Sequence, residues 1–150
     1  MAMAYQLVVI VHVALTMVWF GAGLGLPRRL RAGIARGRSE ATAAAEDAMR
    51  GSRTAILAAL ATIATGIALV LIGGGFALVS PRIHLGLALT ALALLLELVT
   101  RSILRKAERS IASEDDRASA LPRVRRAAMT QGMTHLLIVI VLGLMVWRLA

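Results

Sequence analysis

The sequence predicts an all-α protein, an antiparallel up-down bundle of four transmembrane helices with both termini outside. Of its 150 residues, 59% are apolar and only 17% are charged, a balance far from that of ordinary soluble domains. The apolar residues form four runs, each long enough to cross a hydrocarbon layer of roughly 30 Å at about 1.5 Å per residue. Because backbone groups in lipid need internal hydrogen-bond partners, such long and uniform runs are expected to be helical.

Within a single domain, the four helices are expected at about residues 5–26, 54–78, 83–104 and 127–147. Residues 27–53 and 105–126 are expected to be cytoplasmic loops. Helix formers in these loops are expected to extend the second and third helices, with a break before Pro122. Only four residues separate the second run from the third, which predicts an antiparallel hairpin of these two helices.

The basic residues predict the orientation in the membrane. Seven arginines follow the first run and eight basic residues lie between Arg101 and Arg126, whereas the connection between the second and third runs has only Arg82. The positive-inside rule then places both long loops in the cytoplasm and both termini on the periplasmic or extracellular side of a bacterial inner membrane. The formal net charge is +9, but the basic residues lie in the loops between the apolar runs. We therefore do not expect nucleic-acid binding.

Small residues are expected where the helices touch one another. The first helix carries Gly21, Gly23 and Gly25, and this face is also a candidate surface for a homodimer. The second helix carries Thr62 and Gly66, and the three glycines at 73–75 are expected to loosen or kink its end.

Ionisable side chains inside a membrane are costly and usually face the bundle interior or water, so each is a functional candidate. The predicted spans contain four that need an explanation: His12, His84, Glu97 and His135. On the fourth helix, His135 continues a polar stripe with Gln131 and Thr134 that is expected to turn inward. This stripe fits either an interhelical hydrogen bond or a ligand or proton-transfer role for His135.

Glu97 precedes Arg101 by four residues, which is the favourable orientation for an ion pair on a helix. A structural pair near the cytoplasmic end of the third helix is therefore expected. The alternative is a Glu97 that carries protons or binds a cation.

His12 lies inside the first helix, and Trp19, seven residues later, lies on nearly the same face. The chain has no Cys, so a neutral imidazole is its best ligand for haem iron or copper. Counting residues from the outer helix ends places His12 about 10 Å deep, His84 about 5 Å and His135 about 20 Å. His84 is therefore the preferred second haem ligand, and His135 is the alternative.

A further pattern in the first helix is a His, a Trp seven residues later and a closing Leu-Pro-Arg, formed here by His12, Trp19 and the tripeptide Leu26-Pro27-Arg28. In this pattern the chain resembles the HemJ-type protoporphyrinogen oxidase family. Members are small bacterial membrane proteins of four or five helices that bind haem b, related in pattern to CopD-type copper-resistance domains. His84, between Ile83 and Leu85, is similar to the opening of the family's third helix.

The resemblance implies that His12 is an axial ligand of haem b and that Trp19 belongs to the same signature. The chain departs from the family where Gly86 replaces an expected Lys, and where Thr130 and Gln131 stand near an expected Asn-Glu pair. The expected function is that of a haem b-binding inner-membrane redox protein, a candidate oxidoreductase that exchanges electrons with a quinone or membrane partner or acts on a porphyrin.

Two alternatives stay open beside the haem hypothesis. One is a CopD-like carrier of copper or another small cation, with ligands drawn from His12, His84, Met17 and Glu97. The other is an accessory membrane subunit whose polar groups serve only helix packing and partner docking.

Overall fold

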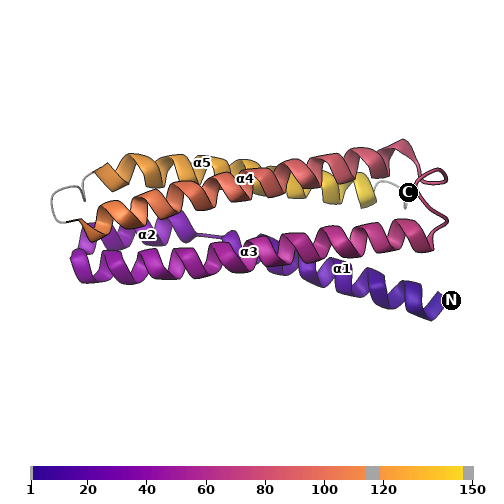
Figure 1. The fold of residues 1–150 in the computed structure, drawn as a ribbon, viewed down its shortest axis with the longest axis horizontal. Coiled ribbons are helices and arrows are strands. Elements are labelled where there is room, and N and C mark those ends of the chain that lie inside the picture. The colour runs from indigo at the N-terminus through magenta and orange to yellow at the C-terminus, as the bar shows by residue number, and fades with distance from the viewer. Residues whose placement is uncertain (1, 114–118, 147–150) are drawn as a thin grey trace.

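The computed structural model describes residues 2–113 and 119–146, and within these ranges all regular structure is helical. The helices follow one another as α1 Ala2–Gly23, α2 Leu26–Arg36, α3 Arg38–Ile72, α4 Pro81–Ala112 and α5 Ala120–Val146. Helices α3, α4 and α5 run the length of the molecule in alternating directions, while α1 and α2 together cover a similar length (Figure 1). Four segments are long and apolar enough to cross a membrane. Three of them are α3, α4 and α5, and the fourth is formed by α1 and α2 together. The predicted all-α bundle of four membrane-length segments is confirmed.

The second and third helices extend into the two segments predicted as cytoplasmic loops, as expected, and more of these segments is helical than predicted. Most of residues 27–53 is helical, as α2 and the first turns of α3, and α4 and α5 take up much of residues 105–126. The break expected before Pro122 is present, because α4 ends at Ala112 and α5 begins at Ala120. A proline in the first turn of a helix costs little, since its missing N–H would have no partner there. The predicted end of the fourth helix at residue 147 lies outside the described residues.

The first predicted helix is divided into α1 and α2 by a glycine break. Gly25 has φ +75, a left-handed conformation that glycine adopts readily, and Pro27 lies in the first turn of α2. At Gly51 of α3, a Cβ atom would lie 2.8 Å from the Leu26 side chain and 3.2 Å from the Ala22 carbonyl oxygen. The break therefore coincides with a close crossing of the chain over α3, and it turns α2 along the first turns of that helix.

Helix α3 ends at Ile72, six residues before the predicted end at residue 78. Gly74 and Gly75 have φ +104 and +90, so the backbone leaves the helix at the glycines expected to loosen it. The chain then returns as α4, which packs against α3, so the predicted hairpin is confirmed.

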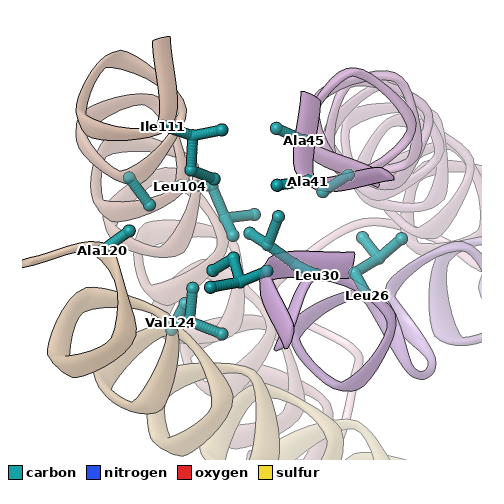
Figure 2. Packing of buried hydrophobic residues seen from close by; sticks show 12 residues of the cluster. Leu26, Leu30, Ala41, Ala45, Leu104, Ile111, Ala120 and Val124 are labelled. Carbon is teal, nitrogen blue, oxygen red and sulfur yellow. The ribbon is translucent and has the colours of Figure 1, made fainter. Parts of the chain in front are cut away.

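One end of the bundle contains α2, the start of α3, the end of α4 and the start of α5, and we call these residues (26–53, 101–113 and 119–126) the basic end. Figure 2 shows its core, in which Leu30 of α2 lies between Leu104 and Val124 of the neighbouring helices. Short alanines on α3, including Ala41 and Ala45, let these helices approach closely. The basic end is therefore a closely packed helical bundle, with its arginines around an apolar core.

Packing differs toward the opposite end, where the chain begins. The first half of α1 diverges from α4 and α5 and lies beside α3 (Figure 1). The second half of α1 returns to the bundle through Trp19, which is buried among small residues of α3 and α4, notably Ala55, Ala59 and Ala93. The bundle interior also contains buried polar side chains from α3, α4 and α5.

Candidate functional site

A buried carboxyl group lies at mid-length in the bundle. Glu97 of α4 is 0% exposed, and its Oε2 accepts a hydrogen bond of 3.2 Å from Nε2 of Gln131 on α5. The indole N–H of Trp19 on α1 faces the same carboxyl group without reaching hydrogen-bonding geometry. We call Glu97, Gln131 and Trp19, which come from three helices, the central polar site.

Three buried atoms of the central polar site have no hydrogen-bond partner among the described residues. They are Oε1 of Glu97, Oε1 of Gln131 and Nε1 of Trp19. A buried polar atom without a partner costs about 1–3 kcal/mol, and most such atoms in proteins are satisfied. The central polar site thus has two free acceptors, on Glu97 and Gln131, and one free donor, on Trp19, beside the hydrogen bond that joins Glu97 to Gln131.

The predicted ion pair of Glu97 with Arg101 is wrong. Within the described part of the chain, no basic side chain lies within ion-pair distance of Glu97, and the ion pair that is formed joins Arg29 to Asp47. The Glu97 side chain turns toward α5, where the Gln131 amide binds it, and Arg101 stays partly exposed one turn away.

The polar stripe on α5 turns inward, as predicted. Gln131 and Thr134 are buried, and His135 is half-buried. His135 donates from Nε2 to the Phe20 carbonyl oxygen at 3.1 Å, and its ring lies 4.7 Å from the Phe20 ring. At Gly23, a Cβ would collide with the Gln131 amide and lie 3.2 Å from His135 Nε2, so this glycine lets α1 and α5 meet. His135 therefore links two helices.

His12 is held by a hydrogen bond to α3. Its Nδ1 lies 2.9 Å from Oγ1 of Thr65, and that hydroxyl donates its own hydrogen to the Ala61 carbonyl oxygen at 2.9 Å. The same hydroxyl lies 3.0 Å from the Thr62 carbonyl oxygen. When it donates to either carbonyl, it accepts from Nδ1–H, and the lone pair of His12 is then on Nε2. Gly66 makes room for the ring, because a Cβ there would lie 3.2 Å from His12 Cε1. Such an orienting hydrogen bond is typical of histidines that ligate metals.

His84 is exposed near the start of α4, where Nδ1 donates to the Ser80 carbonyl oxygen at 3.4 Å and the ring lies 6.1 Å from that of Phe76. Its Nε2 also keeps the lone pair. No contact joins the three imidazoles: His12 meets α3, His84 meets its own first turn, and His135 meets α1. Along α1, His135 lies at the level of Phe20, about 12 Å from His12.

Trp19 lies away from His12, with which the sequence pattern grouped it. Trp19 packs in the core and faces Glu97, about 10 Å along α1 from His12, so the two residues do not form one site. The described residues contain no group of three or more His, Cys, Asp or Glu side chains that could hold a metal ion. Met17, a candidate copper ligand, is 69% exposed.

Stability should depend on the pairing within the central polar site. Gln131→Leu is expected to lower the free energy of unfolding by about 1–3 kcal/mol, because Oε2 of Glu97 loses its hydrogen bond from Gln131 and both oxygens of the buried carboxyl group are then without a partner. The double variant Glu97→Leu with Gln131→Leu is expected to recover most of that loss, since no buried polar group is then left alone. Thermal unfolding in detergent measures both, with the exposed Gln6→Leu as control. Equal losses in the single and double variants would contradict this pairing.

The sequence analysis did not identify Thr65 as the partner of His12, or Gln131 as the partner of Glu97. The available signals were indirect: Gly66 was noted as a packing glycine, and Gln131 as part of an inward stripe. Both partners lie on other helices, 53 and 34 residues away in sequence. No protein-family model, curated protein or solved structure matches this chain.

Proposed function

We propose that this chain is a multi-pass protein of a bacterial inner membrane that binds haem b through His12 and takes part in electron transfer. Four membrane-length segments support the membrane assignment. The arginines gathered at the basic end support a cytoplasmic position for that end, with both termini on the opposite side. Haem, when bound, supplies one-electron redox chemistry, and the protein tunes it through ligand identity and burial.

The observation that carries this proposal is the geometry of His12. Thr65 contacts Nδ1 of the imidazole at 2.9 Å, and the tautomer with its proton on Nδ1 carries on Nε2 the lone pair that a haem iron requires. The first half of α1 diverges from α4 and α5 (Figure 1), and His12 is only half-buried, so its ring can be approached from the bilayer. A membrane quinone reaches the same flank as electron donor or acceptor.

His84 is the second ligand in this proposal. His12 meets α3 seven residues before the end of that helix, about 10 Å deep, and His84 lies three residues into α4, about 5 Å deep. His84 also carries its lone pair on Nε2. His135 lies deeper, and its Nε2 is used for the bond to the Phe20 carbonyl oxygen.

The test is the reduced-minus-oxidised absorption spectrum of the detergent-purified protein from cells grown with ample haem. The expected result is a haem b spectrum with close to one haem per protein chain. A featureless spectrum would overturn the proposal. Copper bound in its place by equilibrium dialysis would favour the carrier alternative, and the absence of both would favour an accessory subunit.

A further inference from the structure

We infer that Glu97, paired with Gln131 in the centre of the bundle, is a proton-binding site that takes up and releases a proton inside the membrane-length segments. This inference goes beyond the haem proposal and does not depend on it. The ligand is a single proton carried on the Glu97 carboxyl group, exchanged with water.

A negative charge on Glu97 is costly at this position. Glu97 is fully buried, and among the described residues it has no cationic partner. An ionised carboxylate in apolar surroundings is far more costly than a neutral carboxylic acid, so the closed bundle favours the form that holds a proton.

The second step is the pair of unpartnered acceptors. Oε1 of Glu97 and Oε1 of Gln131 belong to side chains that are already joined by the bond from Nε2 to Oε2. Two acceptor oxygens cannot bond to each other, but a proton on Glu97 turns one of them into a donor. A carboxylic acid and an amide then satisfy each other with two hydrogen bonds, so protonation matches the chemistry of this pair.

The third step is that the deprotonated form also has support. The Gln131 N–H donates to the carboxyl group, and the Trp19 indole N–H faces it. Hydrogen bonds from neutral donors favour a carboxylate. The surrounding side chains therefore stabilise both the protonated and the deprotonated form of Glu97. A site that exchanges a proton requires this, whereas a purely structural glutamate does not.

The charged and titratable groups around Glu97 are few. On its own helix, Arg101 lies one turn toward the basic end. From α5, His135 lies one turn beyond Gln131, and from α1 the nearest titratable group is His12, seven residues from Trp19. The facing residues of α3 are uncharged, chiefly alanines. His135 is thus the nearest group with which Glu97 can share a proton.

Buried hydroxyl groups mark routes along the bundle. Toward the basic end, Thr100 donates to Thr130 at 2.7 Å, directly beyond Glu97 and Gln131 on the same two helices. Ser52 and Thr62 are buried on α3, with hydroxyl groups that have no partner among the described residues. Hydroxyls that both donate and accept are suited to relay a proton to the water at the basic end.

The experiment is pH-difference infrared spectroscopy of the full-length protein in detergent. A carboxylic acid C=O band is expected that titrates with pH, lies at the frequency of a buried acid, and disappears in Glu97→Gln. The matched control is Glu46→Gln, which removes an exposed carboxylate of α3 and leaves this band in place. Gln131→Leu is expected to shift the midpoint pH of the band.

Labelling the wild type with 13C-glutamate assigns the band to glutamate without any substitution, so the test does not depend on the folding of a variant. A band present at every accessible pH would show a permanently protonated, structural Glu97 and would overturn the inference. So would the absence of any buried-acid band, or a band that Glu97→Gln leaves unchanged. The measurement needs no haem, so the two proposals can fail separately.

Discussion

Replacing His12 by alanine is expected to abolish the haem b absorption of the purified protein. In the proposed site, His12 ligates the iron through Nε2, while Thr65 contacts the other ring nitrogen, Nδ1, at 2.9 Å. His84→Ala is expected to retain haem with an altered spectrum, because one of two axial ligands is lost. The measurement is the absorption spectrum of each variant, normalised to protein concentration.

His135→Ala is the control for that series, since His135 already uses Nε2 to bind the Phe20 carbonyl oxygen. It is expected to keep the wild-type spectrum. Thr65→Val keeps the ligand but removes its orienting bond, and is expected to weaken haem binding by about 10–100-fold. Loss of the bands in His135→Ala together with their retention in His12→Ala would reverse the assignment.

Gly33→Leu is expected to cause the largest loss of stability in this chain. A Cβ at Gly33 would lie 2.8 Å from the Glu40 carbonyl oxygen and 2.8 Å from the Ala44 Cβ, so both the backbone and a partly buried side chain of α3 would clash with it. A leucine there requires α2 to separate from α3, at an expected cost of about 3 kcal/mol or more. Thermal unfolding in detergent and the rate of trypsin cleavage at the arginines of α2 measure this separation.

Gly132→Leu serves as the matched control, because a Cβ at Gly132 meets nothing within 4 Å. It is expected to change the unfolding temperature little. Equal stability of the Gly33 and Gly132 variants would show that the α2–α3 contact does not hold the basic end together.

The spans and the hairpin could be predicted because they follow from uniform apolar runs and a four-residue connection. The helical structure of residues 27–53 was harder to predict, since arginines interrupt the apolar pattern of α2. Its readable signal was the spacing of Leu26, Leu30 and Ile34, which recur every fourth residue and form one buried face. The many charged residues of this segment lower its average hydropathy, and this average does not show that the apolar residues share one face of a helix.

The candidate site was predicted by residue type more successfully than by partner. An inward polar stripe on α5 could be predicted because lipid excludes it from the other faces. The partner of Glu97 could not be predicted, because the local pattern favours Arg101, four residues away. The contact with Gln131 depends instead on the rotation of α4, which is set by packing among helices far apart in sequence. The bond from His12 to Thr65 depends on the same kind of packing.

The two-part core has a consequence for unfolding. At the basic end, Leu30 and Leu104 are withdrawn from water, so urea should weaken this part directly. Farther along the same helices, side chains such as Leu71 and Leu95 are exposed. In the proposed membrane position, lipid or detergent covers them, and no hydrophobic effect then drives one helix onto another. Continuous helices thus join a urea-sensitive part to a urea-resistant part, and a chemical denaturation curve should show two transitions rather than one cooperative step.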